Sequence, residues 1–99
     1  MEINKKADGS NLEIALSGRL DTTTAPEFEK SLKESINGVT DLTINFEGLD
    51  YISSAGLRVL LSAQKMMNAS GGKMKVIGAN DIVKEIFDVT GFSDILTIE

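Results

Sequence analysis

The sequence contains no histidine and no cysteine, two residue types that often serve in catalysis and metal binding. Without cysteine, disulfide bonds, thiol redox chemistry and thiolate metal ligands are excluded. Without histidine, there is no imidazole base, no imidazole zinc ligand and no Ser-His-Asp triad. We therefore expect a chain that uses no metal ion or other cofactor.

Clusters of basic residues and long apolar runs are also missing. The chain has 10 basic and 15 acidic residues, a formal net charge of -5, and its Lys and Arg residues are scattered. Nucleic acid and anionic membrane surfaces are therefore poor partners for it. The first residues alternate polar and charged side chains, unlike a signal peptide or a transmembrane helix. The prediction is a soluble cytoplasmic protein that binds neither nucleic acid nor membranes.

The familiar catalytic and metal-binding motifs are missing as well. No phosphate-binding loop occurs, since Gly71-Gly72-Lys73 precedes a predicted strand rather than a helix. Asp41, Asp50 and Asp81 do not have the spacing of a metal-binding loop. No G-x-S-x-G segment would support a serine hydrolase. We expect a protein without enzymatic activity of its own.

The chain has the length and composition of one folded domain. It has 99 residues, of which 41% are hydrophobic and 25% charged, as in ordinary globular proteins. No linker, repeat or low-complexity segment interrupts it. A single domain spanning residues 1–99 is predicted.

Alternation of apolar and polar residues predicts the strands. A short strand that opens at Ile3, a turn at residues 8–10 and an alternating strand at 12–16 form an opening hairpin. Further strands are predicted at 42–46 and 73–77, and Ile95, Leu96 and Ile98 predict a closing strand.

Three helices are predicted between and after these strands. The first begins at Thr24-Ala25-Pro26-Glu27, where Thr24 is a hydroxyl cap, and ends at Asn37-Gly38. The second starts after residues 53–54 and ends at 70–72, and the third runs from an Asn80 cap to Gly91. The front half of the second helix has more apolar residues than one core stripe needs, which indicates either ordinary core packing or a partner surface. These residues are Leu57, Val59, Leu60, Leu61 and Ala63.

The order β-β-α-β-α-β-α-β predicts an α/β fold. Helices that connect strands by right-handed crossovers join parallel neighbours, so the small sheet is mixed, with one antiparallel edge. Thr43 and Asn45 interrupt the apolar residues of the 42–46 strand, so one face of the sheet is predicted to lack a cover. The helices should lie mainly on the other face.

The junction between the 42–46 strand and the second helix is the most informative segment. It places two hydroxyls, Ser53 and Ser54, and two small residues, Ala55 and Gly56, at a helix start. A helix start has unpaired N–H groups and a partial positive charge, so a serine there can cap the helix or carry a phosphate. Both roles can coexist, with Ser53 as the cap and Ser54 as the phosphate acceptor. The small residues would leave the serine uncrowded for an approaching kinase.

Asp21 ends a turn on the side of the sheet where ligand and partner sites collect. Two interpretations of this residue stay open. It is either a turn or capping carboxylate, or a residue near Ser54 that orients the hydroxyl or contacts a partner.

Three segments together resemble one known family. They are Gly18-Arg19-Leu20-Asp21 before a Thr-rich helix start, Leu49-Asp50-Tyr51-Ile52-Ser53-Ser54-Ala55-Gly56-Leu57, and Val83-Lys84-Glu85-Ile86-Phe87-Asp88-Val89-Thr90-Gly91-Phe92. In this order and spacing the chain resembles a stand-alone STAS domain of the bacterial anti-sigma-factor antagonist family. The resemblance implies the STAS fold over nearly the whole chain.

The resemblance also implies a function. In that family, a partner serine kinase that is also an anti-sigma factor uses ATP to phosphorylate a serine at this helix start, and a phosphatase resets it. The unphosphorylated antagonist binds the kinase and so frees the sigma factor. Ala55-Gly56-Leu57 matches the small residue, glycine and leucine that follow the family's phosphoserine, which implies Ser54 as the acceptor and Ser53 as the alternative. The implied partner-binding residues are Asp21, Thr22, Thr23, Ser53, Ser54, Ala55, Gly56, Leu57 and Arg58.

Two other functions fit parts of the same pattern. A STAS subunit that binds the ATPase of a lipid-transport complex would share the fold without phosphorylation. A receiver-like domain would instead carry an aspartyl phosphate on Asp50, but the opening hairpin and the lack of an acidic pair after the first strand disfavour it.

Overall fold

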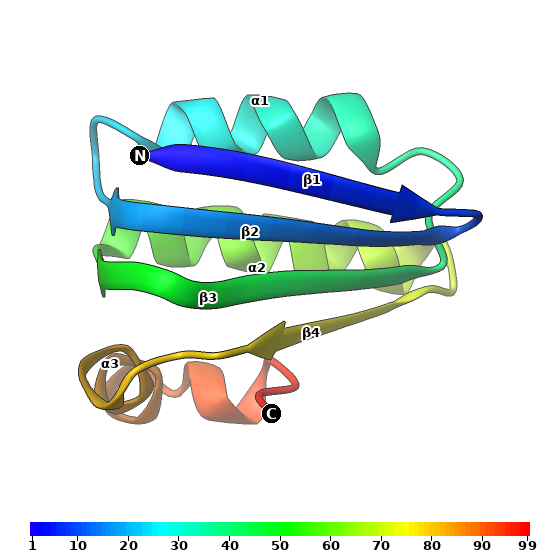
Figure 1. Cartoon of the computed structure of the whole chain (residues 1–99). Helices are drawn as coiled ribbons and strands as arrows, with labels where there is room; N and C mark the ends of the chain where they lie inside the picture. Colours follow the sequence, from blue (N-terminus) through cyan, green and yellow to red (C-terminus); the bar gives the residue numbers. More distant parts are fainter.

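The alternation of apolar residues folds the chain into a four-stranded sheet, as the computed structural model of residues 1–99 shows (Figure 1). The strands are ordered β1-β2-β3-β4; β1 is antiparallel to β2, and the other neighbours are parallel. The predicted mixed sheet with an antiparallel edge is confirmed. In chain order the elements are β1 (Glu2–Asp8), β2 (Asn11–Leu20), α1 (Ala25–Ser35), β3 (Asp41–Ile52), α2 (Ser54–Ala69), β4 (Lys73–Ile77), α3 (Asp81–Thr90) and a 3-10 turn (Phe92–Asp94).

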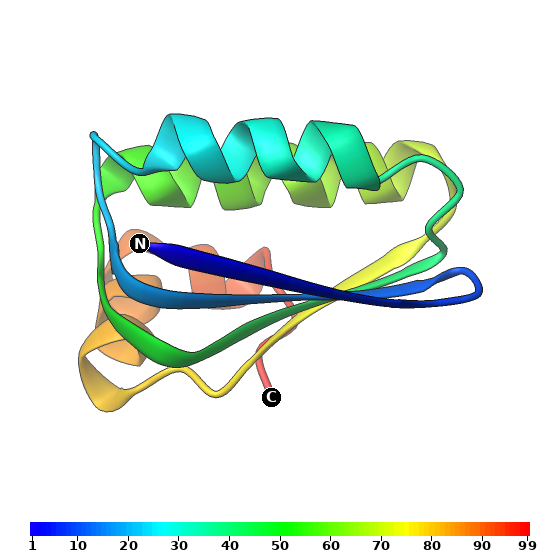
Figure 2. The same cartoon turned by 45° about the horizontal axis from the view of Figure 1, so that its top comes forward.

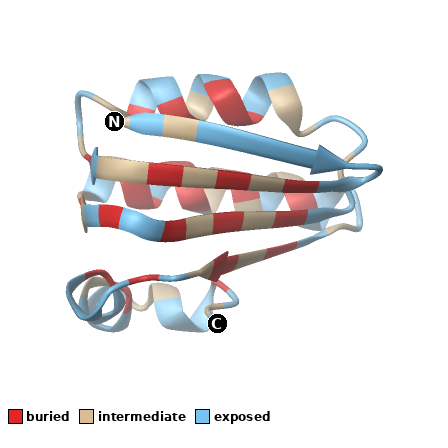
Figure 3. Ribbon diagram, viewed as in Figure 1, coloured by how far each residue is buried: buried red, intermediate tan, exposed pale blue.

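The core lies between one face of this sheet and the helices. Every second residue is buried from Leu12 to Leu16 in β2 and from Leu42 to Phe46 in β3, which gives the alternating bands along these strands in Figure 3. Helices α1 and α2 lie side by side over that face in Figure 2. Phe87 of α3 stacks on Phe46 of β3, with ring centroids 6.3 Å apart, so α3 covers the same face. The prediction that helices occupy mainly one face is confirmed.

Helix α2 has four of its five front apolar residues in the core. Leu57, Val59, Leu60 and Ala63 are buried, and Leu61 is half-buried. The helix packs against α1, β3 and β4. These four side chains therefore fill the core, and the partner-surface interpretation is wrong for them. None of the helices has the length and apolar character needed to span a membrane.

The predicted glycine after the first helix and both predicted ends of the third helix are confirmed. The Asn80 Oδ1 accepts a hydrogen bond from the Val83 N–H (2.8 Å) at the start of α3. Gly38 follows α1 with a φ of 79°, and Gly91 ends α3 with a φ of 80°, both in the left-handed region that favours glycine.

The predicted closing strand is wrong, because the end of the chain meets β4 at one residue only. Ile98 forms an isolated parallel bridge with Val76. The Val76 N–H donates to the Thr97 carbonyl (2.8 Å), and the Glu99 N–H donates to the Val76 carbonyl (2.9 Å). Leu96 enters the core while Ile95 stays 47% exposed. The apolar pattern here reflects the burial of single side chains rather than a strand ladder.

Candidate functional site

The site is built where β2 and β3 end side by side. Leu20 is paired with Ile52 in the parallel register, and the Ser53 N–H donates to the Leu20 carbonyl (2.9 Å). Because the strands are parallel, the residues that follow them emerge at the same edge of the sheet. The turn that begins at Asp21 and the start of α2 are therefore neighbours, as one of the two interpretations of Asp21 expected.

The two adjacent serines differ in how accessible their hydroxyls are. Ser53 lies at the N-cap position with extended backbone, and its carbonyl accepts from the Leu57 N–H (3.0 Å). Its Oγ is buried and has no hydrogen-bond partner. Ser54 is the first residue of α2 and is exposed. The prediction that the Ser53 side chain caps α2 is wrong, because the hydroxyl is enclosed and makes no capping hydrogen bond.

The carboxylate of Asp21 organises the turn that leads into α1. Its Oδ1 accepts from the N–H groups of Thr23 (3.0 Å) and Thr24 (3.1 Å), and Arg19 Nε lies 3.9 Å from Oδ2. The hydrogen bond from the Thr24 N–H is the largest cause that lowers the pKa of Asp21. Partial removal from water opposes it, while the Thr23 N–H, the Thr24 hydroxyl and Arg19 lower the pKa further. The capping interpretation of Asp21 is thus what the hydrogen bonds show.

Thr24 does not cap α1 through its side chain, so this prediction is wrong. Its Oγ1 accepts from the Asp21 N–H (2.9 Å) and donates to the Arg19 carbonyl (2.8 Å). The hydroxyl is therefore used inside the turn. The sequence places a carboxylate and several hydroxyls in a row, and only the backbone path decides which of them reaches the free N–H groups.

The remaining predicted residues divide into exposed and buried ones. Ala55 is half-buried, and three residues are exposed: Thr22, Thr23 and Arg58. Leu57 is buried, with 5% exposure, and Gly56 is buried beneath the helix start.

Gly56 serves packing rather than access to the serine. A Cβ at this position would lie 2.7 Å from Leu20 Cγ and 2.8 Å from Ile52 Cγ1. Only glycine lets α2 start so close to the two strand ends. The expectation that Gly56 leaves room for an approaching kinase is therefore wrong: it faces the core.

One contact beside the site was not foreseen from the sequence. The Arg19 guanidinium carbon lies 4.6 Å from the centre of the Tyr51 ring, a cation–π geometry. The β2–β3 register pairs these two residues. Nothing in the local sequence connects them, because two bulges shift the register between these strands.

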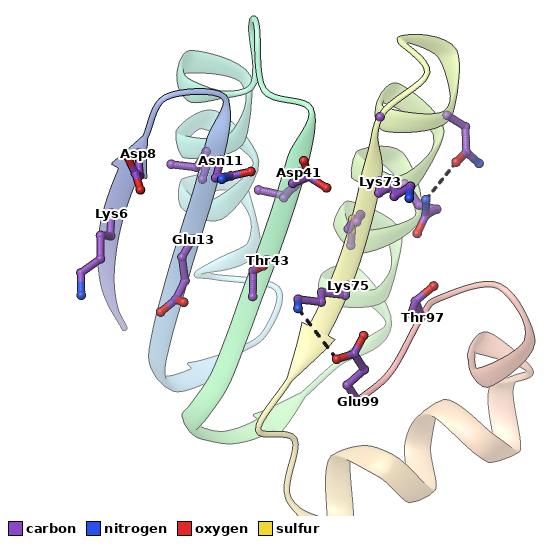
Figure 4. A pocket seen from close by; sticks show the side chains of 16 residues that line it. Lys6, Asp8, Asn11, Glu13, Asp41, Thr43, Lys73, Lys75, Thr97 and Glu99 are labelled. Carbon is purple, nitrogen blue, oxygen red and sulfur yellow. Dashed lines mark hydrogen bonds and ion pairs between the residues drawn. The ribbon is translucent and has the colours of Figure 1, made fainter.

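A polar hollow lies at the other end of the strands, across their first residues (Figure 4). Its lining mixes lysines with carboxylates, and Lys75 Nζ lies 3.8 Å from Glu99 Oε1. The charges there are of both signs and partly paired, which does not select one class of ligand. None of the predicted site residues lines it.

A small mixed sheet with helices on one face and an exposed serine at the helix start after its longest strand places the chain in a class of small α/β domains. The model of the STAS domain family matches residues 2–99, and the chain belongs to this family.

The similar proteins carry related names. The chain is 29% identical over 87 residues to an anti-sigma-B factor antagonist of Staphylococcus aureus, covering 87% of this chain and 81% of that protein. It is 26% identical over 98 residues to the anti-sigma-B factor antagonist of Bacillus subtilis, covering 99% and 90%. The fold matches that of the anti-sigma factor antagonist SpoIIAA in its unphosphorylated form, with a TM-score of 0.86 and 20% identity over 99% of this chain and 88% of the other. The phosphorylated form of the Bacillus protein SpoIIAA matches with a TM-score of 0.78 and 19% identity, over 99% and 91%.

Proposed function

We propose that this chain is an anti-sigma-factor antagonist, switched by phosphorylation of Ser54. In the unphosphorylated form it binds an anti-sigma factor, which is also its serine kinase, and thereby frees the sigma factor. The names of the similar proteins from S. aureus and B. subtilis support the antagonist function. The observation that carries the choice of residue is that Ser54 is exposed at the first position of α2, whereas the Ser53 hydroxyl is buried.

The start of α2 suits a phosphate. The first turn of α2 has no acidic residue, so no carboxylate offsets the partial positive charge of the helix start. A phosphoserine carries about -1.5 to -2 charges near neutral pH and would interact favourably with this end of the helix. The fold should therefore survive modification. The occurrence of SpoIIAA in unphosphorylated and phosphorylated forms with this fold supports the same expectation.

The switch itself would act on the partner's affinity. If the kinase covers Ser54, a phosphate there must lose its water inside the interface, and burying such a dianion costs several kcal/mol even beside a cation. A loss of about 4 kcal/mol lowers the affinity roughly a thousandfold. The partner would touch the exposed residues Thr22, Thr23, Ser54 and Arg58 and the half-buried Ala55. Asp21, Ser53, Gly56 and Leu57 would position this surface from below.

The proposal gives this chain the role of a substrate and binding protein, not of an enzyme. The partner kinase would bind and use ATP, and a separate phosphatase would reset Ser54. Both steps belong in the cytoplasm, where sigma factors act. No cofactor is required of the chain itself.

Phosphate incorporation tests the residue assignment. We expect intact-mass measurement after incubation with the kinase and Mg-ATP to show one added phosphate, and fragmentation of the tryptic peptide to locate it on Ser54. Ser54→Ala should abolish incorporation, while the matched control Ser53→Ala should leave it unchanged, because its hydroxyl is not accessible. Phosphate on Ser53, or none on either serine, would contradict the proposal.

Partner binding tests the functional class. Ser54→Asp should keep the melting temperature of the wild type and weaken binding to the anti-sigma factor at least tenfold, since one carboxylate imitates only part of a phosphate's charge. Affinity capture from cells gives the independent check. Recovery of the ATPase of a lipid-transport complex instead of an anti-sigma factor would contradict the proposed antagonist function.

A further inference from the structure

Arg58 lies one helical turn after Ser54 on α2. The helix runs without interruption from Ser54 to Ala69, and both residues are exposed. Side chains four residues apart on a helix are neighbours, with about 5–6 Å between their Cβ atoms. A group added to the Ser54 hydroxyl is therefore within reach of the Arg58 guanidinium.

The guanidinium of Arg58 has no anionic partner in the structure. No carboxylate lies within ion-pair distance of it, and α2 contains no acidic residue at all. Its helix neighbours at three and four residues' distance are Ser54, Ala55, Leu61 and Ser62. Of these four, the exposed Ser54 is the residue to which the proposed function assigns an anionic state.

Two other charged side chains at this edge of the sheet, Arg19 and Asp21, are engaged with each other. Arg19 Nε lies 3.9 Å from Asp21 Oδ2, and the Arg19 guanidinium also stacks on Tyr51. Asp21 Oδ1 is held by the N–H groups of Thr23 and Thr24. The Asp21 carboxylate is thus committed to the turn before α1, whereas Arg58, one turn from Ser54, has no ion-pair partner.

We infer that Arg58 binds the phosphate of phosphorylated Ser54 in an ion pair along the surface of α2. A guanidinium offers a fork of N–H donors that matches two phosphate oxygens. Phosphorylation then has two effects on the proposed partner surface: it adds negative charge at Ser54 and engages the cation of Arg58. This inference rests on the proposed function in one respect, namely that Ser54 becomes phosphorylated.

The test uses a full-length chain made with phosphoserine at position 54 by genetic incorporation, so that no kinase is needed. A phosphorus NMR titration measures the second pKa of the phosphate, which is about 6 for an unperturbed phosphoserine. A neighbouring cation favours the dianion and lowers this pKa. We expect Arg58→Gln to raise it by about 0.3 units relative to the wild type, the size of a surface helix ion pair. Arg58→Lys, which keeps the charge, should stay nearer to the wild-type value.

Lys65→Gln is the matched control, because it removes the other cation of the same helix at an exposed position far along α2 from Ser54. It should leave the phosphate pKa unchanged. An unchanged pKa in Arg58→Gln, or an equal rise in Lys65→Gln, would overturn the inference. Because the phosphate is introduced without a kinase, failure of this ion pair and failure of the kinase assays on Ser54 are separate results.

Discussion

The carboxylate of Asp21 is connected to its surroundings through both oxygens, although a third of the side chain is exposed (34%). One oxygen accepts from two backbone N–H groups, and the other lies near Arg19. Only the ionised carboxylate can accept all of these interactions well. The turn that brings β2 next to the start of α2 therefore depends on the charge of one side chain.

This dependence predicts that the loss of stability caused by Asp21→Asn varies with pH. Since the folded-state pKa of Asp21 is lowered, its contribution to the free energy of unfolding is complete above the unfolded-state pKa of about 4. It is lost as the pH falls through the folded-state pKa. We expect the melting temperature of Asp21→Asn to lie below that of the wild type at pH 6, and the two to converge as the pH falls through the lowered folded-state pKa of Asp21. The control is Asp8→Asn at the exposed end of β1, next to the hairpin turn. A difference in melting temperature between Asp21→Asn and the wild type that does not change with pH would contradict this prediction.

The close packing around Gly56 predicts that adding one methyl group at this position lowers the stability of the protein. In Gly56→Ala the new Cβ would overlap Leu20 and Ile52, both of which are fully buried. Overpacking of this kind costs about 1–3 kcal/mol. Denaturant unfolding should show this loss although alanine favours helices over glycine. As a control, Lys65→Ala is an exposed change in the same helix, and its free energy of unfolding should stay within about 0.5 kcal/mol of the wild type. A Gly56→Ala variant as stable as this control would contradict the prediction of overpacking.

At the scale of whole elements, helix α3 is attached to the sheet through its cap. Asn80 accepts from the Val83 N–H and donates to the Leu49 carbonyl (3.2 Å), which links the start of α3 to β3. The helix then buries Val83 and Phe87 against the core. One side chain thus satisfies a helix N–H and a carbonyl late in the longest strand.

Two substitutions separate these two hydrogen bonds. Asn80→Ala removes both and should lower the free energy of unfolding by about 1–2 kcal/mol. Asn80→Asp keeps the cap but cannot donate to Leu49, so it should lose less than the alanine variant. Chemical denaturation measures both losses. Equal losses would mean that the cap itself contributes nothing.

The elements that were predictable from the sequence are those whose apolar pattern repeats several times or whose ends carry specific capping residues. The apolar alternation of β2 and the Asn80 and Gly91 ends of α3 are of this kind. The last residues are not, because three apolar side chains can be buried one at a time, as Leu96 is, without forming a strand. At the site, the neighbourhood of Asp21 and Ser53 followed from the strand order, but the direction of the Ser53 hydroxyl depends on packing that no local pattern encodes.

At the scale of the whole molecule, one core joins β2, β3, β4 and the helices, while β1 contributes only the partly buried Ile3. The buried apolar side chains form a single cluster that includes residues of β2, β3, β4 and all three helices. The proposed phosphate lies outside this cluster, at the exposed start of α2. A charge added there can alter the surface without disturbing the contacts that stabilise the fold.

This separation predicts a local response to phosphorylation. In the chain with phosphoserine at position 54, we expect changes in amide NMR chemical shifts around the end of β2, the turn before α1 and the first turn of α2. Amides of β1 and β4, on the outer sides of the sheet, should keep their shifts and their hydrogen-exchange rates. The unphosphorylated protein is the reference. Widespread changes in β1 and β4 would show that the phosphate alters the fold.

The enclosed hydroxyl of Ser53 has a consequence for substrate recognition. In an unfolded chain or a short peptide, two consecutive serines offer an enzyme almost the same chemical target. In the folded domain one of the two hydroxyls is out of reach. A kinase acting here would therefore need no subsite that distinguishes the two serines, provided that it recognises the folded domain. A peptide spanning the junction should then be a poorer and less selective substrate than the intact protein.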